Sequence, residues 1–253
     1  MAVLSRVAGK QRVDVVLVER GLAPSRERAR ALVLAGVVYS GERRVEKAGD
    51  TLAADAPLEV RGADHPYVSR GGVKLEGALD AFALDVAGLV CADFGASTGG
   101  FTDCLLTRGA ARVHAIDVGY GQLHPKLRND PRVVVRERVN ARHLAEDALG
   151  EPIDLIVIDA SFIGLGKLLP AAHRVLRPGG EIVAMVKPQF EVDRKDLKKG
   201  VVRDPIARSA AIDKVEAEAR ALGLEVLART DSTLAGPEGN LEAFLRLRRP
   251  PPA

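Results

Sequence analysis

The feature that most constrains the fold is a series of short apolar runs that alternate with amphipathic segments from residue 73 to residue 247. Such runs, rich in β-branched residues, are typical of strands buried on both faces, and the amphipathic segments between them supply covering helices. The pattern predicts an α/β fold with a mostly parallel sheet. No helical pattern separates the last two runs, which predicts a terminal antiparallel hairpin. The expected strands are 89–94, 112–116, 133–136, 155–158, 181–186, 225–229 and 242–247, and the expected helices are 73–82, 100–107, 168–175 and 206–222.

The first sixty residues have a different pattern, that of a small α+β module. An apolar helix is expected to end at Gly21, and a basic helix to begin after Ser25 and end at Gly36, because these residue types cap helices. A hairpin with its turn at Ser40 and Gly41 follows. The expected elements of this module are helices 13–20 and 26–35 and strands 37–39, 43–45 and 58–60. Residues 62–68 contain Gly and Pro without periodicity and are expected to link domains at 1–61 and 69–249, with a tail at 250–253.

Positive charge is in excess only in this first module. Residues 1–62 hold 11 basic and 8 acidic side chains, and the totals of 37 and 34 leave 26 of each in the remainder. Such an asymmetry favours contact with a polyanion. A basic helix followed by the hairpin GVVYSGERRVEKAGD resembles the S4 RNA-binding module, whereas an ordinary solvated helix face is the alternative. The expected RNA-binding residues are Arg26, Arg28, Arg30, Arg43, Arg44 and Lys47, with Arg70 at the start of the next region.

A glycine-rich turn follows the first strand of the larger region, in the segment VCADFGASTGGFTDCLL. Its glycines permit a ligand to approach the backbone, and Asp93 can accept hydrogen bonds from a cationic or polar group. Asp117 ends the next strand, where doubly wound folds place the carboxylate that binds ribose hydroxyls, and Asn140 is placed to reach an adenine edge. This favours S-adenosylmethionine over NAD, because no second phosphate-binding half follows. The expected cofactor-binding residues are Asp93, Gly95, Ser97, Thr98, Gly99, Gly100, Asp117 and Asn140. A structural tight turn, with Asp117 capping it, is the alternative.

Two later strands each end in a charged residue at the edge where open α/β sheets bind ligands. Asp159 ends the run DLIVIDASF, and Lys187 ends the run EIVAMVKPQF. A lysine at the tip of an apolar strand is partly desolvated, which favours its neutral form and suits a general base. A strand-end salt bridge is the alternative for this pair.

Several segments together identify a family resemblance that runs through nearly the whole chain. The segments are VSRGGVKLEGAL, DFGASTGGFTDCLL, DVGYGQL, RNDPRVVV, VIDASFI, VKPQFE and GPEGNLEAFL. They resemble the TlyA family, whose catalytic domain is similar to the Rossmann-like FtsJ-type ribose 2′-O-methyltransferases. The resemblance implies a catalytic tetrad of Lys74, Asp159, Lys187 and Glu242, with Lys187 as the base and Glu242 paired with Lys74. It also implies methylation of a cytidine ribose in ribosomal RNA of one or both subunits.

The remaining observations bear on other classes of protein. No apolar run reaches the length of a transmembrane helix, the N-terminus lacks a secretory pattern, and Cys91 and Cys104 suggest reduced thiols, so a cytoplasmic location is expected. No cluster of metal ligands is evident, and no metal is expected. A basic segment, 194–203, could contact substrate phosphates or be a plain solvated run. The alternatives to an enzyme are a non-catalytic RNA-binding ribosome-assembly factor and a membrane-active protein, since members of the family often carry the label haemolysin.

Overall fold

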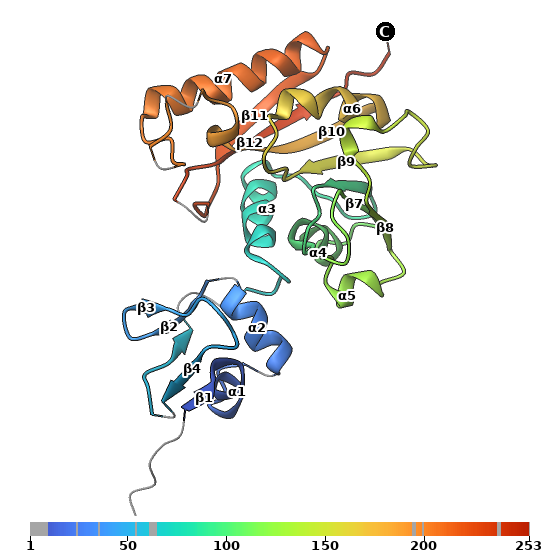
Figure 1. Cartoon of the computed structure of the whole chain (residues 1–253). Helices are drawn as coiled ribbons and strands as arrows, with labels where there is room; N and C mark the ends of the chain where they lie inside the picture. The colour runs from blue at the N-terminus through green and yellow to red at the C-terminus, as the bar shows by residue number, and fades with distance from the viewer. Residues whose placement is uncertain are drawn as a thin grey trace, which may run out of the picture. The chain divides into compact units, whose positions relative to one another are not determined.

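The computed structural model describes residues 10–23, 25–34, 36–53, 55–60, 65–193, 196–198, 200–236 and 239–252. The chain divides into two compact units, Met1–Ser69 and Arg70–Ala253, coloured from blue to red along the chain in Figure 1. Ala35, residues 62–64 of the expected linker, and Arg194, Lys195 and Lys199 of the basic segment lie outside the described residues.

Unit 1 contains the two helices and the hairpin that the sequence predicts, but Ser40 pairs with Arg43, so the hairpin turns at Gly41 and Glu42 instead of Ser40 and Gly41. Ser25 accepts a hydrogen bond from the Arg28 amide at 3.1 Å, and Gly21 and Gly36 adopt positive φ, as expected of helix caps. A pair of short strands, β1 and β4, was not expected, because segments of three residues are too short to show a clear alternation. The elements are β1 (Lys10–Arg12), α1 (Val13–Glu19), α2 (Arg26–Leu34), β2 (Val38–Ser40), β3 (Arg43–Arg44), β4 (Thr51–Ala53) and β5 (Glu59–Val60), with sheets β1-β4 and β3-β2-β5.

Unit 2 is built on one seven-stranded sheet with the order β11-β12-β10-β9-β6-β7-β8. All neighbours pair in parallel except β12, which pairs antiparallel with both β10 and β11. The mostly parallel sheet and the terminal antiparallel hairpin are therefore confirmed. The strands are β6 (Val90–Phe94), β7 (Arg112–Asp117), β8 (Val133–Glu137), β9 (Ile153–Ile158), β10 (Leu176–Val186), β11 (Glu225–Asp231) and β12 (Ala243–Arg248).

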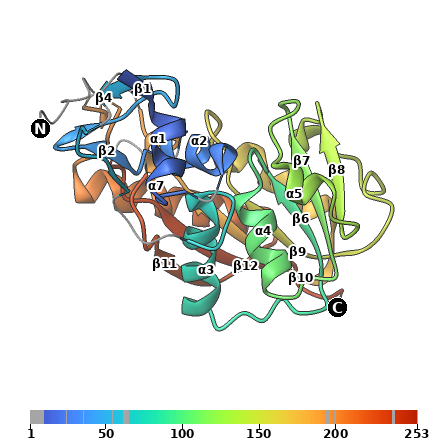
Figure 2. The same cartoon turned by 90° about the horizontal axis from the view of Figure 1, so that it is seen from below.

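Helices cover both faces of this sheet. On one face α3 and α4 lie side by side in both views (Figure 1 and Figure 2), and the Phe101 ring of α4 lies 6.1 Å from the Phe244 ring of β12. On the other face α6 and α7 contribute to a single apolar core with alternate residues of the strands. The helices are α3 (Arg70–Ala81), α4 (Gly100–Thr107), α5 (Pro125–Arg128), α6 (Leu169–Val175) and α7 (Pro205–Ala221), with 3₁₀ turns η1 (Ala141–His143), η2 (Leu165–Lys167) and η3 (Pro188–Phe190).

Many element ends differ from the prediction by one to three residues, and three differences are larger or concern the candidate site. β10 begins at Leu176 instead of residue 181, because Leu176 already pairs with Ile153 of β9. The Pro-Gly-Gly segment, typical of a turn, lies between this pair and the next one, Glu181 with Leu155, and shifts the register. The four-residue helix α5 was too short to leave a periodic pattern. Glu242 lies immediately before β12, which runs from Ala243 to Arg248, so it is at the end of the sheet and not within the strand.

Candidate active site

Three adjacent strands bring three members of the expected tetrad to one edge of the sheet. Val186 of β10 pairs with Ala243 of β12, so the next pair along this antiparallel ladder is Lys187 and Glu242. Asp159 follows β9, the neighbour of β10 on its other side, and its amide donates to the Phe94 carbonyl of β6 at 3.0 Å. The edge that collects these side chains is the carboxyl end of the parallel strands, where open α/β sheets bind ligands.

Two lysine–carboxylate pairs occupy this edge. The Lys187 ammonium lies 2.6 Å from Asp159 Oδ1 and donates to the Ser161 hydroxyl at 2.8 Å. Lys74, on α3, donates to the Glu242 carboxylate. The Lys74 side chain is 9% exposed and that of Glu242 is 2% exposed. Buried charged groups are tolerated when each has a partner of opposite charge, and here each lysine is paired with one carboxylate.

The glycine-rich turn connects β6 to α4 and touches this edge. Gly95 has φ +88°, and a Cβ there would lie 2.5 Å from the Asp159 carbonyl oxygen, so only glycine allows the two loops to approach. Ser97 also has positive φ, at +48°. Gly99, with φ +95°, precedes Gly100, the first residue of α4, and the Thr98 carbonyl accepts from the His124 amide at 3.2 Å. The turn therefore places backbone next to Asp159, between β6 and β9.

Asp93 lies at the base of this turn, fully buried on β6. One carboxylate oxygen accepts from the Thr102 hydroxyl at 2.7 Å, while the other, Oδ1, is buried without a hydrogen-bond partner among the described residues. Burial raises the pKa of Asp93 to about 7, only partly offset by the hydrogen bond from Thr102. A buried carboxylate with an unused acceptor is suited to receive a donor from a bound molecule.

Asp117 and Asn140 hold the turns that follow β7 and β8. Asp117 accepts the Ser97 amide at 2.8 Å and the Gly119 amide at 2.7 Å, one on each oxygen. Asn140 accepts the Arg142 amide at 3.1 Å and so caps η1. Each carboxylate oxygen of Asp117 retains a second lone pair that could accept from a hydroxyl. The capping role anticipated for Asp117 is thus present, and it leaves room for a ligand contact.

An exposed aromatic residue beside the lysine pair was missed by the sequence analysis. Phe162 is 91% exposed and has φ +66°, and its ring lies 5.5 Å from that of Phe190. A left-handed conformation at a phenylalanine costs on the order of 1–3 kcal/mol and is found mostly at functional sites. The only signal in the sequence was its place, three residues after Asp159.

Unit 1 places two of the expected RNA-binding arginines around a buried carboxylate. Asp14 is 0% exposed and lies 3.0 Å from the Arg12 guanidinium, 3.0 Å from Arg26 and 3.2 Å from Arg30. These ion pairs, that with Arg12 foremost, hold the pKa of Asp14 well below its usual range. Arg12 was not among the predicted residues. We refer to Arg12, Arg26 and Arg30 as the arginine triad.

The other expected RNA-binding residues lie apart from this triad. Arg43, Arg44 and Lys47 are exposed on and after the β2–β3 hairpin, and Arg28 is on the same helix as Arg26. In unit 2, Arg70 begins α3 and donates to the Ala235 carbonyl at 3.3 Å, in the segment that leads to Glu242. Arg70 therefore lies about one helical turn before Lys74 on α3 and contacts the segment that precedes Glu242.

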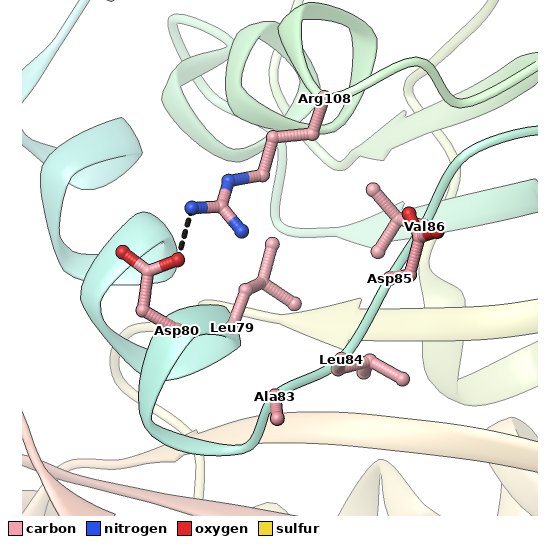
Figure 3. Close-up of a pocket in the computed structure, with 7 residues that line it drawn as sticks. All are labelled: Leu79, Asp80, Ala83, Leu84, Asp85, Val86 and Arg108. Carbon is pink, nitrogen blue, oxygen red and sulfur yellow. Dashed lines mark hydrogen bonds and ion pairs between the residues drawn. The ribbon is translucent and has the colours of Figure 1, made fainter.

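A cavity of about 430 Å³ lies elsewhere in unit 2. Figure 3 shows Arg108 reaching across it to Asp80, with which it forms an ion pair. The cavity lies at the C-terminal ends of α3 and α4, whereas the catalytic candidates lie at the carboxyl edge of the sheet. Within the described ranges, no group of three or more His, Cys, Asp or Glu side chains is arranged to hold a metal ion. Nor does any helix there have the length and apolarity to cross a membrane.

Comparisons with known proteins bear on both units. Residues 67–249 match the FtsJ-like methyltransferase family, and residues 11–56 match the S4 domain. The 16S/23S rRNA (cytidine-2′-O)-methyltransferase TlyA of Mycobacterium tuberculosis is 49% identical, over 96% of this chain and 91% of its own length. Hemolysin A of Brachyspira hyodysenteriae is 39% identical, over 91% of this chain and 97% of its own. A solved structure from Streptococcus thermophilus, provisionally named a hemolysin, has a TM-score of 0.76 at 40% identity, covering 96% of this chain and 90% of that one.

Proposed function

The chain belongs to the TlyA family, with an S4 domain followed by an FtsJ-like methyltransferase domain, and from this membership we propose that it methylates a cytidine ribose 2′-hydroxyl of ribosomal RNA. The methyl donor in this proposal is S-adenosylmethionine. The relatives named as methyltransferases support the reaction, and the relative from M. tuberculosis supports RNA of either subunit as substrate.

One observation carries the proposal, namely the four side chains at the sheet edge. Lys187 pairs with Asp159, Lys74 pairs with Glu242, and the ladder of β10 and β12 makes the two pairs neighbours. A buried lysine, Lys74, and a largely buried one, Lys187, at one ligand-binding edge are costly for a protein that only binds RNA. They are useful to an enzyme that must remove a proton from a weakly acidic hydroxyl.

The residues around the glycine turn fit the proposed cofactor. Asp93 offers an unused buried acceptor for a cationic or polar donor, and Asp117 keeps lone pairs for ribose hydroxyls. The absence of a side chain at Gly95 and Gly99 lets the Asp159 carbonyl and the Leu127 side chain pack against the turn, which fixes its backbone beside the ligand-binding edge. We assign Asp93, Gly95, Ser97, Thr98, Gly99, Gly100, Asp117 and Asn140 to this site. When bound, S-adenosylmethionine supplies an electrophilic methyl group on its sulfonium.

The chemistry that falls to the protein is proton removal and alignment. In this proposal Lys187 takes the proton from the ribose 2′-hydroxyl, and S-adenosylmethionine held at the glycine turn would supply the methyl group to the oxygen and leave as S-adenosylhomocysteine. Asp159 then stabilises the ammonium that forms, because its carboxylate lies 2.6 Å from Nζ. Glu242 and Lys74 hold each other beside Lys187 and orient the hydroxyl. Alignment of the two reactants supplies at best about 7–11 kcal/mol of the acceleration.

Two further features support RNA as the substrate. Phe162, whose ring is exposed, directly follows Ser161, and the Ser161 hydroxyl accepts a hydrogen bond from Lys187. Aromatic rings commonly hold bases that have left a stack. The arginine triad of unit 1 has three cations for one carboxylate and is suited to RNA phosphates. We propose that unit 1 anchors the RNA with the triad, Arg28, Arg43, Arg44 and Lys47, and that Arg70 contacts it near the reacting ribose.

The test is transfer of labelled methyl from S-adenosylmethionine to separated small and large ribosomal subunits that lack native methylation. A methylated 2′-hydroxyl resists alkaline cleavage, so the modified nucleotide can be mapped. We expect a labelled, cleavage-resistant cytidine, and we expect Lys187→Ala to lower transfer by about 10²–10⁴-fold, the usual contribution of a general base. Binding of the cofactor, measured by calorimetry, should stay within about twofold of the wild type, because Lys187 is not assigned to the cofactor site.

Failure would take two distinct forms. No transfer to either subunit, with the cofactor bound, would favour the RNA-binding assembly factor over the enzyme. Transfer that is unchanged in Lys187→Ala would leave the enzyme but remove Lys187 as its base.

A further inference from the structure

Two chain segments that follow Asp159 and Lys187 are joined along their length. Lys187 contacts Asp159 and Ser161, the Phe190 ring contacts that of Phe162, and Glu191 contacts the segment again at Leu165. The contacts occur in the same order along both segments. We call residues 159–165 the Phe162 segment and residues 187–191 the Lys187 segment.

Glu191 forms the last of these contacts, and its environment is unusual for a carboxylate. Its side chain is 3% exposed, and Oε1 accepts the buried Leu165 amide at 2.7 Å, at the start of η2. The other oxygen, Oε2, lies 3.7 Å from the Lys214 ammonium of α7. Burial raises the pKa of Glu191, which means that its charge is poorly compensated by these partners. Burying a carboxylate whose charge is poorly compensated costs free energy of folding, which points to a function for its hydrogen bond.

The Phe162 segment needs an anchor at this end. Phe162 holds a left-handed backbone conformation and is 91% exposed, so apart from the contact with the Phe190 ring neither packing nor backbone preference keeps it in place. Gly164, between Phe162 and Leu165, brings the segment so close to Glu191 that a Cβ there would lie 3.1 Å from Oε2. The first end of the segment is held by Lys187 and the second by Glu191.

We propose that Glu191 is a positioning residue, which fixes the Phe162 segment against the Lys187 segment so that the exposed ring and Ser161 keep their places beside Lys187. The inference rests on the proposed function, in which Lys187 removes the proton and the ring faces a nucleobase. It assigns a role to the glutamate of the VKPQFE segment, which the tetrad leaves unused. Glu191 itself touches no reacting atom in this arrangement.

The main experiment compares Glu191→Leu with Glu191→Gln. Leucine keeps the bulk but removes the acceptor, whereas glutamine retains an amide oxygen for the Leu165 amide. We expect Glu191→Leu to lower kcat for methyl transfer by about 10- to 100-fold, because small displacements in an active site have effects of this size. The KM for S-adenosylmethionine and its dissociation constant should change by less than about twofold, and Glu191→Gln should recover most of kcat.

A second variant approaches the same contact from the other side. Gly164 has φ −69°, so alanine fits its backbone, and the added Cβ would push on Glu191 Oε2. We expect Gly164→Ala to lower kcat in the wild type but to have little further effect in Glu191→Leu, where the carboxylate is gone. Glu225→Leu is the matched control. Glu225, on β11, forms a half-exposed ion pair with Arg248 of β12, so its replacement should leave kcat unchanged.

A fluorescence measurement keeps the inference testable without enzyme activity. The chain contains no tryptophan, so Phe162→Trp introduces a single reporter. Its anisotropy should fall when Glu191→Leu is added and recover with Glu191→Gln. Equal anisotropy and equal kcat with and without Glu191→Leu would overturn the proposal, as would a Gln variant as impaired as the Leu variant. No methyl transfer by the wild type would instead contradict the proposed function, and the anisotropy would still decide the role of Glu191.

Discussion

The two units use buried carboxylates to hold cations in opposite ways. In unit 1, the fully buried Asp14 holds three half-exposed guanidinium groups, so two positive charges are left over and face solvent. In unit 2, Glu242 holds only Lys74, and Asp159 holds only Lys187 among the pairs of the site. The first arrangement is ordered but keeps a net positive charge, which suits the binding of a polyanion. The second is balanced and enclosed, which suits chemistry that moves one proton.

The loss of one cationic partner should therefore have different consequences for the buried carboxylates of the two units. Around Asp14, the loss of one arginine leaves two others to compensate the carboxylate, so the cluster should tolerate single changes. Around Glu242, the loss of Lys74 leaves a buried charge with no partner in the pair, which is among the larger single costs in proteins. The predictions below test this contrast.

The largest expected effect is on the Lys74–Glu242 pair. Lys74→Met or Glu242→Gln alone should lower the free energy of unfolding by about 3–5 kcal/mol, because each leaves its partner buried and uncompensated. The double variant should recover most of that stability, since no charge remains, but none of the methyl transfer. Denaturant unfolding and the methyl-transfer assay measure the two properties separately.

The corresponding change in unit 1 provides the comparison. Arg26→Ala alone should cost far less stability than Lys74→Met, because Arg12 and Arg30 still compensate Asp14. Equal losses at the two sites would refute the contrast. So would a double variant of Lys74 and Glu242 that still transfers methyl groups.

The features that could be predicted from the sequence are those with a local signal, whereas those that were missed depend on contacts between distant residues. The strands of unit 2 were evident because each contains a short apolar run, and Asp159 and Lys187 were evident because each follows such a run. The three-residue strands β1 and β4 are too short for such a signal. The resemblance to S4 and FtsJ-like domains, stated from the ordered motifs, is confirmed by the matches to both families.

What the sequence missed depends on contacts between distant residues. The role of Asp14 at the centre of the triad requires α1 to pack against α2, which no local pattern in the sequence indicates. Lys74 and Glu242, 168 residues apart, were paired only through the family resemblance. Phe162 and Glu191 could not be found, because exposure, a positive φ and a buried carboxylate are properties of the folded chain.

The next effect in size concerns RNA binding by the triad. The triple change of Arg12, Arg26 and Arg30 to alanine should weaken RNA affinity and reduce the slope of log K against log salt by about 0.7–0.9 for each phosphate contact that is lost. The rate at saturating RNA should be little changed, because these residues are not assigned to the chemistry. Filter binding at several salt concentrations, with methyl transfer in parallel, measures both.

A matched control uses arginines of unit 2. Arg220, Arg229 and Arg248 each pair with surface carboxylates, and their triple change to alanine removes the same charge. If both triple variants lose RNA affinity equally, the effect is one of net charge, and the triad has no special role.

A smaller effect is expected when the triad keeps its arginines but loses its carboxylate charge. Asp14→Asn should lower the melting temperature of unit 1 at neutral pH, because the pKa of Asp14 is depressed by its ion pairs. A depressed pKa contributes stability above the unfolded value of about 3.9, and that contribution is lost as the pH falls through the folded value. The two proteins should therefore converge in stability in acid, as followed by circular dichroism during heating. A constant difference at every pH would mean that shape, and not charge, makes Asp14 necessary.

The smallest effect concerns Asp93, a fully buried carboxylate of the site that pairs with no arginine or lysine among the described residues. Its pKa of about 7 lies above the unfolded value, so its contribution to the stability of the free protein is greatest below about pH 4 and is lost as the pH rises through 7. A cationic donor on the unused Oδ1 would favour the carboxylate, so cofactor binding should release protons below pH 7. The dissociation constant should therefore fall, by less than about tenfold, between pH 6 and 7.5.

Calorimetry in two buffers of different ionisation enthalpy counts the protons released, and Asp93→Asn serves as the matched variant because it keeps the shape and cannot titrate. We expect the wild type to release protons at pH 6 and the variant to release fewer. Equal release in both would mean that Asp93 stays protonated beneath the turn and holds Thr102 alone. In that case Asp93 would be neutral because it carries a proton, whereas Asp159 and Glu242 are neutralised by lysines, and the contrast with the open arginine triad would become sharper.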